Sequence, residues 1–523
     1  TAVGYAALSA EDAHGYNTAI GYNTLAVQDA GTDAYNTAVG YGAGMLISTG
    51  VRNTLIGTSA GDALTTGNYN VALGMYALST EDAGSYIVAI GYEALRVQDS
   101  GADAYNIAIG YAAGGTVTTG KYNILIGGLA GDAITDGEKN VAIGHEALTT
   151  DTGDGHNTAV GYRALKTLNT ATTGYNTAIG FDAGLLMTTG TLNTLVGAGA
   201  GNALTSGAYN VAMGYESLSN ETAYGKNTAI GTFALQDLDA GADAANTVIG
   251  YSSGAVMTTG INNTLIGSWA GDALTTGINN TAVGLRALSA EDGHGGNVAV
   301  GVDALMLLNA GGDAYNVAVG FESGKVMSTG VQNTIIGSFA GDAITTGDYN
   351  VAVGYAALST EDANGRNTAI GHETLKTLNA GADAYNVAVG YAAGEVMSTG
   401  TANTLIGGLA GDALTTGGDS VAVGYGALGT EDTASRTVAI GYLALGTQNS
   451  TLTNTYNVAV GFSAGKDVTD GIENTLIGGN AADGLTTAKE CTLIGANTAA
   501  GQIVTGNQNT SLGRYTLYNL TDG

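Results

Sequence analysis

A single repeat runs through the chain and restricts its fold more than any other feature. The string Asn-Thr-Ala-Ile/Val-Gly recurs along all 523 residues, and its glycine marks the same point in every copy. These index glycines lie 17, 19, 17 and 17 residues apart before the pattern restarts, as at Gly21, Gly91 and Gly161. The register therefore returns every 70 residues. A short fixed period of this kind is typical of a solenoid or a fibrous array.

Each repeat predicts one β-strand followed by a turn. The residues before the index glycine read β-branched, small, β-branched, as in Thr18, Ala19 and Ile20, and no helical periodicity is present. The chain has no proline, as expected where nearly every strand N–H is needed by a ladder. We expect an all-β fold, a repetitive parallel β-solenoid or β-roll with rungs of 17–19 residues in a 70-residue, four-rung super-repeat. The repeat predicts one continuous domain over residues 1–523 with about 30 rungs.

Composition excludes several classes of partner. The chain has 15 basic and 45 acidic residues and a net charge of −30, which argues against nucleic acid and anionic membranes. No apolar run approaches the roughly 20 residues of a membrane span, so we expect no membrane insertion. A single cysteine excludes a disulfide framework and a thiolate metal cluster.

Asparagine occupies the position four before the index glycine in 25 of 29 rungs. Its side-chain amide can bond to the equivalent amide one rung away, so we interpret the column as a structural ladder at a corner of the coil. A glycan- or ligand-binding role is the weaker alternative. The ladder residues that we single out are Asn17, Asn36, Asn53, Asn70, Asn106, Asn123, Asn140 and Asn263.

The position two before the index glycine is apolar in 28 of 29 rungs, and its strand neighbours are β-branched and apolar or Thr. Both faces of the strand therefore look buried, although a coil this small has only one interior. The second face needs another partner, most simply further copies of the same chain, so we predict a homo-oligomer. We assign the interface between chains to the small residues Ala19, Ala72, Ala142, Ala212, Ala282 and Ala352.

Aromatic and acidic residues also recur in columns. Tyr often follows the index glycine, as at Tyr5 and Tyr22, and either binds sugars or forms a structural stack, which we favour. Adjacent Glu-Asp pairs such as Glu81 and Asp82 predict solvated turns. Calcium bound in the Gly-Ala-Asp-Ala-Tyr-Asn loops is a minor alternative, because the repeat signature of calcium-binding β-rolls is missing.

Catalytic patterns are not evident, and we expect no enzyme. The five His are scattered and form no metal-spaced pair. Glycine-rich stretches lack the lysine of a phosphate loop. Cys491 replaces an Asn of the ladder, and Trp269 shares a column with Leu and Phe, so we interpret both as structural.

Strings such as Asn17-Thr18-Ala19-Ile20-Gly21-Tyr22 resemble the N-T-A-I-G-Y-x-A-L repeats of phage tail-fibre and bacterial surface-fibre proteins. They are also similar to the head repeats of trimeric autotransporter adhesins, a left-handed parallel β-roll whose units are shorter. The resemblance covers essentially the whole chain. It implies a trimeric extracellular fibre, on a virion tail or a cell surface, that meets a cell-surface glycan or protein receptor.

We therefore expect the rod-like shaft of a tail fibre or adhesin, acting in attachment. A self-assembling extracellular filament or sheath without a receptor is the alternative, and ice binding is disfavoured because Val and Ile interrupt the Thr column. The chain begins in a strand and ends in a turn, which predicts a piece of a longer fibre or ends covered by other subunits.

Overall fold

The computed structural model describes residues 1–12, 15–153, 155–170, 172–500 and 506–518. These residues form strands, turns and bends and contain no helix. Contacts divide the chain into two compact units, Thr1–Asn262 and Asn263–Gly523, which are described separately. Among the described residues no helix has the length and apolar character of a membrane span.

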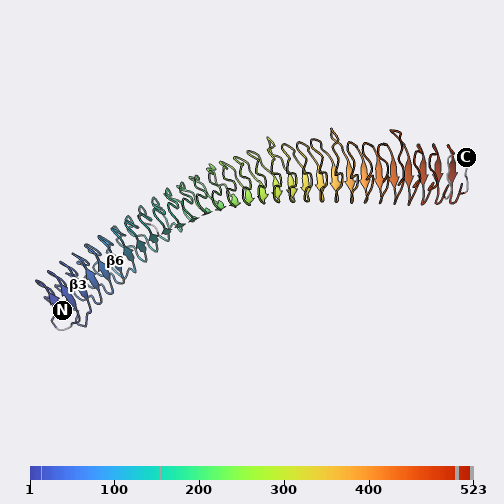
Figure 1. Cartoon of the computed structure of the whole chain (residues 1–523). Coiled ribbons are helices and arrows are strands. Elements are labelled where there is room, and N and C mark those ends of the chain that lie inside the picture. The colour runs from blue at the N-terminus through green and yellow to red at the C-terminus, as the bar shows by residue number, and fades with distance from the viewer. Residues whose placement is uncertain (13–14, 154, 171, 501–505, 519–523) are drawn as a thin grey trace. The chain divides into compact units, whose positions relative to one another are not determined.

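The first unit is a parallel β-solenoid with one short strand in each turn of the coil (Figure 1). Its strands are β1 Ala2–Val3, β2 Thr18–Ile20, β3 Thr37–Val39, β4 Thr54–Ile56, β5 Val71–Leu73, β6 Val88–Ile90, β7 Ile107–Ile109, β8 Ile124–Ile126, β9 Val141–Ile143, β10 Thr158–Val160, β11 Thr177–Ile179, β12 Thr194–Val196, β13 Val211–Met213, β14 Thr228–Ile230 and β15 Thr247–Ile249.

The second unit has the same construction. Its strands are β16 Thr264–Ile266, β17 Thr281–Val283, β18 Val298–Val300, β19 Val317–Val319, β20 Thr334–Ile336, β21 Val351–Val353, β22 Thr368–Ile370, β23 Val387–Val389, β24 Thr404–Ile406, β25 Val421–Val423, β26 Val438–Ile440, β27 Val458–Val460, β28 Thr475–Ile477, β29 Thr492–Ile494 and β30 Thr510–Leu512.

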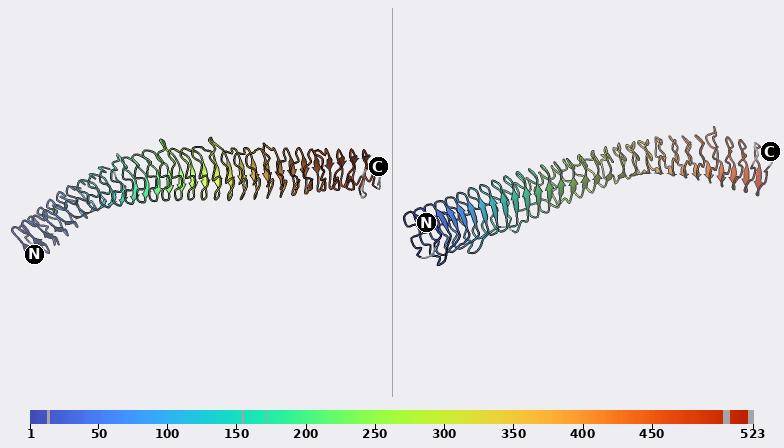
Figure 2. Two further views of the ribbon diagram at one scale, coloured as in Figure 1. Left: turned by 45° about the horizontal axis from the view of Figure 1, so that its top comes forward. Right: turned by 60° about the horizontal axis from the view of Figure 1, so that its bottom comes forward.

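Pairing is parallel and keeps the register of the repeat. Ala142 of β9 pairs with Ala159 of β10, and Ala159 pairs in turn with Ala178 of β11, so each sequence column becomes a spatial ladder. Within each unit the strands line one side of the coil and the turns line the other (Figure 2). The prediction of an all-β, parallel β-solenoid with about 30 turns is confirmed.

The index glycine is fixed by the spacing of the rungs. Gly144 has a φ of +141°, a region that L side chains rarely adopt. A Cβ at this position would lie 2.2 Å from the carbonyl oxygen of Gly161 in the next rung. Only glycine allows this backbone approach, which accounts for the strongest signal in the sequence.

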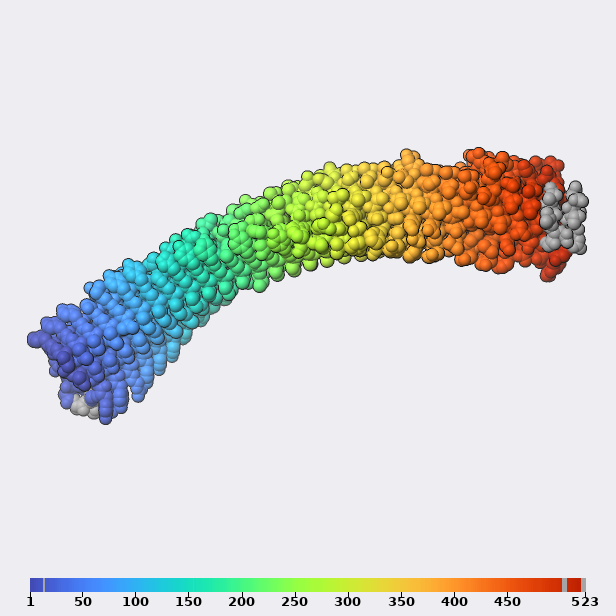
Figure 3. All heavy atoms as spheres, in the orientation of Figure 1, coloured from blue at the N-terminus to red at the C-terminus, as the bar shows by residue number. Residues whose placement is uncertain are grey.

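The 70-residue super-repeat has a packing origin. Leu125 extends into the coil from the centre of β8, where Gly114 of the preceding rung and Gly131 of its own rung leave space for it. A Cβ on either glycine would lie 2.7 Å from a methyl carbon of Leu125. The same large residue between two glycines recurs at Leu55, Leu195, Ile335 and Leu405. One bulky rung in four therefore interlocks with the rung before it. On the face in view, rungs of one unit meet without an open gap (Figure 3).

Candidate functional site

The asparagine column lies inside the coil. All eight predicted ladder residues, Asn17 to Asn263, are at most 3% exposed. Asn123 shows the typical bonding: its Nδ2 donates to the carbonyl oxygen of Gly137 (2.9 Å) and its Oδ1 accepts the backbone N–H of Asn140 (2.9 Å). Direct amide-to-amide bonds occur in some rungs, as from Asn53 Nδ2 to Asn36 Oδ1 at 3.2 Å. An amide bonded in this way closes its own turn and also joins the next rung.

Replacing Asn123 by Asp should destabilise the surrounding rungs by roughly 1–3 kcal/mol at neutral pH, because a carboxylate oxygen would then face the Gly137 carbonyl. Only the protonated acid can donate to that carbonyl, so the loss of stability in this variant should become smaller as the pH falls. Hydrogen exchange of β7 to β9 measures the effect. Asn169→Asp adds the same charge at an exposed amide and serves as the control. Equal losses in the two variants would contradict a structural ladder.

The assignment of the alanine column to an interface between chains was wrong. Ala19, Ala72, Ala142, Ala212, Ala282 and Ala352 are all fully buried within their own coil. Each occupies the middle of a three-residue strand, and both flanking side chains point outward. The Ala column therefore belongs to the core, where a small side chain fits the narrow interior.

The exposed face of each sheet is formed instead by the first and third residues of the strands. These side chains are half-buried or exposed, as the 41% exposure of Ile20 illustrates. Every one of them is Thr, Val, Ile, Leu or Met, apart from the two-residue β1. None of the described strands contains a charged residue, although the chain carries a net charge of −30. An uncharged, largely apolar face therefore follows the strands of each unit.

Two aromatic columns flank the strands in sequence. One follows the index glycine, and the other lies five residues before it, a column that the sequence reasoning did not single out. Tyr22 stacks between Tyr5 and Tyr41 at ring centroid distances of 5.2 Å, and Tyr16 stacks on Tyr35 at 5.1 Å. Sugars bind aromatic residues on their ring faces, and here neighbouring rings within a stack cover those faces. The geometry favours the structural interpretation of these stacks over sugar binding.

In four of the repeated Glu-Asp pairs the Glu is not solvated, contrary to expectation. Glu81, Glu291, Glu361 and Glu431 are fully buried, whereas the Asp that follows is exposed in the first three and half-buried at Asp432; Glu11 of the first pair is half-buried. Glu221, at the same point of its own super-repeat, is also fully buried. The turn N–H groups require an acceptor at this point, and the Glu side chain folds back into the coil to supply it.

Donors surround the carboxylate of Glu81. Its Oε1 accepts the backbone N–H of Gly84 (2.7 Å), and its Oε2 accepts the N–H (3.0 Å) and the hydroxyl (2.9 Å) of Ser100 and the amide of Gln98 (3.3 Å). Gln98 in turn accepts a bond from the ladder residue Asn106 (3.0 Å). The buried acid is thus connected to the asparagine ladder.

The super-repeats fall into two classes at this point. In three super-repeats the residue seven positions after the second index glycine, which is Gly21 in the first copy, is Gln. In the next rung of these copies, the residue at the same position is Ile or Val, as Gln28 and Ile47 show. Four copies have Leu followed by Met instead, as at Leu238 with Met257. All these side chains are fully buried. The paired exchange makes both core positions apolar, and it removes a donor from the buried acid.

Glu81→Gln should cost more stability than Glu221→Gln. Glutamine has one acceptor oxygen, and its NH₂ group would face the donors around Glu81, at a cost of roughly 1–3 kcal/mol. Glu221 accepts bonds from backbone N–H groups, those of Tyr224 (3.1 Å), Ala240 (3.4 Å) and Ala223, and lacks the side-chain donors that surround Glu81. Burial raises the pKa of Glu221, so the folded chain holds this proton more tightly than the unfolded chain.

The pH dependence of stability tests the account of Glu221. The raised pKa means that the contribution of Glu221 to stability falls as the pH rises through the window between its ordinary and its raised pKa. The wild type should therefore gain stability relative to Glu221→Gln on acidification. Hydrogen exchange of the rungs around each residue, followed against pH, provides the measurement. Equal losses for Glu81→Gln and Glu221→Gln at neutral pH would contradict this account.

The loop aspartates proposed as calcium ligands make protein contacts. Asp243 accepts the backbone N–H of Gly225 (3.2 Å) and pairs with Lys226 (2.7 Å), which holds the pKa of this carboxyl below its usual range. Asp313 accepts the N–H of Gly295 (2.9 Å) in the next copy. These bonds give the loop carboxylates a structural role, and calcium stays an untested expectation.

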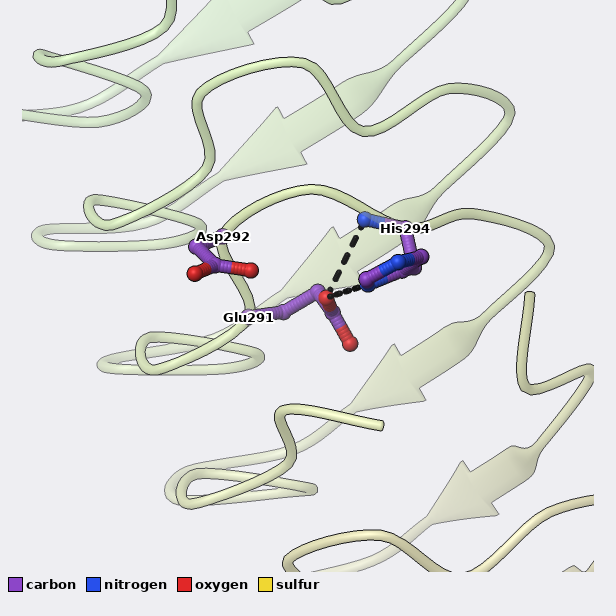
Figure 4. Close-up of side chains that lie close together, drawn as sticks. All are labelled: Glu291, Asp292 and His294. Atoms are coloured by element: carbon purple, nitrogen blue, oxygen red, sulfur yellow. Dashed lines mark hydrogen bonds and ion pairs between the residues drawn. The ribbon is translucent and has the colours of Figure 1, made fainter. Parts of the chain in front are cut away.

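Among the described residues, two acidic groups bring three potential ligand atoms within 4.8 Å of one another: Glu291, Asp292 and His294, and Glu81, Asp82 and Asp99. In the first, one Glu291 oxygen accepts the backbone N–H of His294 (3.1 Å) and lies 3.4 Å from its Nδ1, while Asp292 lies to one side (Figure 4). Calcium takes six to eight oxygen ligands, so three atoms that include a nitrogen do not make such a site.

The remaining candidates show no concave reaction site. Cys491 is buried, and its thiol lies near the carbonyl oxygens of Lys489 and Gly506. Trp269 is 42% exposed, which differs from the packing role expected for it. A hollow of about 200 Å³ beside His156 and Glu138 is smaller than the roughly 300–1,000 Å³ of typical ligand pockets.

Comparison with known proteins adds no assignment. No family model matches the chain, and neither the curated proteins nor the solved structures contain a match.

Proposed function

We propose that this chain forms the shaft of an extracellular fibre, such as a phage tail fibre or a bacterial surface adhesin, and that several copies associate side by side. The proposal rests on the uncharged outer face of the sheet. A chain with a net charge of −30 repels its own copies, and a charge-free strip lets two copies meet without that repulsion. The role is mechanical: the rod holds a binding tip at a distance and has no catalytic part.

The size of the face supports association between copies. With rungs about 4.8 Å apart and strands of about 10 Å, the 15 strands of one unit present roughly 700 Å². Two such faces in contact would bury about 1,400 Å², within the range of stable protein interfaces. The occupant that we propose is a second copy of this chain, because only an equally long and equally regular surface matches the face along its whole length.

Trimeric assembly, placement on a virion tail or cell surface, and contact with a glycan or protein receptor come from the resemblance of the repeat strings. Native mass spectrometry and electron microscopy of the purified chain test the proposal. We expect discrete rods with a fixed copy number, three by resemblance. Filaments of indefinite length would favour the receptor-free extracellular filament, and a stable folded monomer would overturn both.

A further inference from the structure

Four tyrosines form the longest uninterrupted stack in the column that lies five residues before the index glycine. The rings of Tyr69 and Tyr86 are 5.1 Å apart with planes 4° from parallel. Tyr86 and Tyr105 are 5.0 Å apart at 3°, and Tyr105 and Tyr122 are 5.5 Å apart at 5°. Neighbouring phenols therefore face each other from consecutive rungs.

The backbone holds these rings in place and leaves their edges open. Tyr86 donates its N–H to the carbonyl of Asn68 (3.1 Å), and Tyr122 donates to that of Ala104 (2.8 Å), so each residue is tied to the rung before its own. The four side chains are 42–51% exposed. An oxidant in solution can thus reach phenols whose separation is already set by the coil.

We propose that these stacks are sites of oxidative tyrosine coupling, which joins neighbouring rungs through covalent dityrosine bonds. The co-reactant is a one-electron phenol oxidant, such as a haem peroxidase with hydrogen peroxide. The inference concerns a modification of the single chain and does not depend on the fibre function proposed above.

The coupling balances in atoms and electrons. Each of two stacked tyrosines gives one electron to the oxidant and releases its phenolic proton, which leaves two phenoxyl radicals. The radicals combine through a carbon–carbon bond between ring positions ortho to the oxygens. The hydrogen at each of these carbons then moves to its oxygen, which restores two phenols. Hydrogen peroxide takes up both electrons and both protons and becomes two water molecules.

Proximity explains why coupling should occur within the stacks. Radicals held on consecutive rungs meet without diffusion, and preset geometry of this kind accelerates a reaction strongly. Tyr209 provides an internal comparison, since it is 60% exposed but has Leu192 and Lys226 as its column neighbours. It offers the same phenol to the oxidant without a stacked tyrosine in its column.

Peptide mapping tests the inference on the full chain. Trypsin cuts after Arg96, Lys121 and Lys139, so a bond between Tyr105 and Tyr122 would join peptide 97–121 to peptide 122–139. After peroxidase treatment we expect this joined species, lighter than the sum of its peptides by two hydrogen atoms. In a mixture of isotope-labelled and unlabelled chains it should form within single chains.

Two variants on the same peptide separate the stack from general reactivity. Tyr105→Phe keeps an aromatic ring in the column but cannot form a phenoxyl radical, and should lower the yield of the joined species on the order of tenfold or more. Tyr111→Phe removes a phenol that stacks on Tyr92 in the other column, and should leave the yield unchanged. Persistence of the species in Tyr105→Phe, mixed isotope pairs, or equal coupling at Tyr209 would overturn the inference.

Discussion

A triple variant is expected to abolish association between copies of this chain while leaving the coil folded: Val300→Glu, Val319→Glu and Ile336→Glu. The three residues end strands β18, β19 and β20, pair with one another in register, and point outward. Association would bury their carboxylates next to those of another copy. A loss of about 4 kcal/mol weakens binding roughly a thousandfold, and several buried like charges exceed that value.

The control places the same three charges on exposed apolar residues outside the strands, at Ile278, Leu307 and Val396. Native mass spectrometry reports the copy number, and circular dichroism reports the fold. We expect monomers from the strand variant and wild-type assemblies from the control. If both variants form intact assemblies, the interface between copies does not lie on the outer face of the sheet.

The architecture was predictable because the repeat constrains it at every rung. A 17-residue unit has no room for two helices and a turn, and its β-branched strand and absent proline agree with a parallel ladder. The structure adds the reason for the longer period. Leu125 between Gly114 and Gly131 ties consecutive rungs to one another, and the sequence shows this pattern only once the coil brings these positions together.

The direction of the strand faces was the principal error, although the sequence contained the evidence to avoid it. Asn17 and Ala19 are two positions apart, so they lie on the same side of an extended strand. We expected the Asn ladder at a corner of the coil and the Ala column against another chain, although two positions on the same side of the strand should face the same surroundings. The apolar character of both faces concealed the conflict, because hydrophobicity alone could not decide which face is the interior.

The buried glutamates could not be identified from local sequence. A Glu-Asp pair in a turn is usually solvated, and nothing near Glu81 shows that its side chain folds inward. Besides the local N–H groups of Ala83 and Gly84, its donors come from Gln98 and Ser100, 17 and 19 residues later, which reach it only through the coil. The sequence carries one sign of the buried acid. Copies with Gln in the column of Gln98 have Ile or Val in the next rung, whereas copies with Leu in that column have Met.

A second triple variant tests whether the alanine column faces another chain or the interior of its own coil: Ala282→Glu, Ala299→Glu and Ala318→Glu. If these residues formed an interface between chains, the variant would stay folded and lose only its assembly. The structure buries all three completely and pairs them along β17, β18 and β19. Each substitution forces a larger, charged side chain into an apolar interior, at a cost of several kcal/mol. We therefore expect these rungs to unfold even in a monomer.

Unfolding should stay local, because each rung contacts only its neighbours. Hydrogen exchange should show that protection is lost over β16 to β20 and kept at β27 and β28, several rungs further along the same unit. Val300, Val319 and Ile336 occupy the outward positions of the same region, so their variant carries the same charges without this loss. If the alanine triple variant instead stays folded and protected and is only monomeric, the alanine column meets another chain after all.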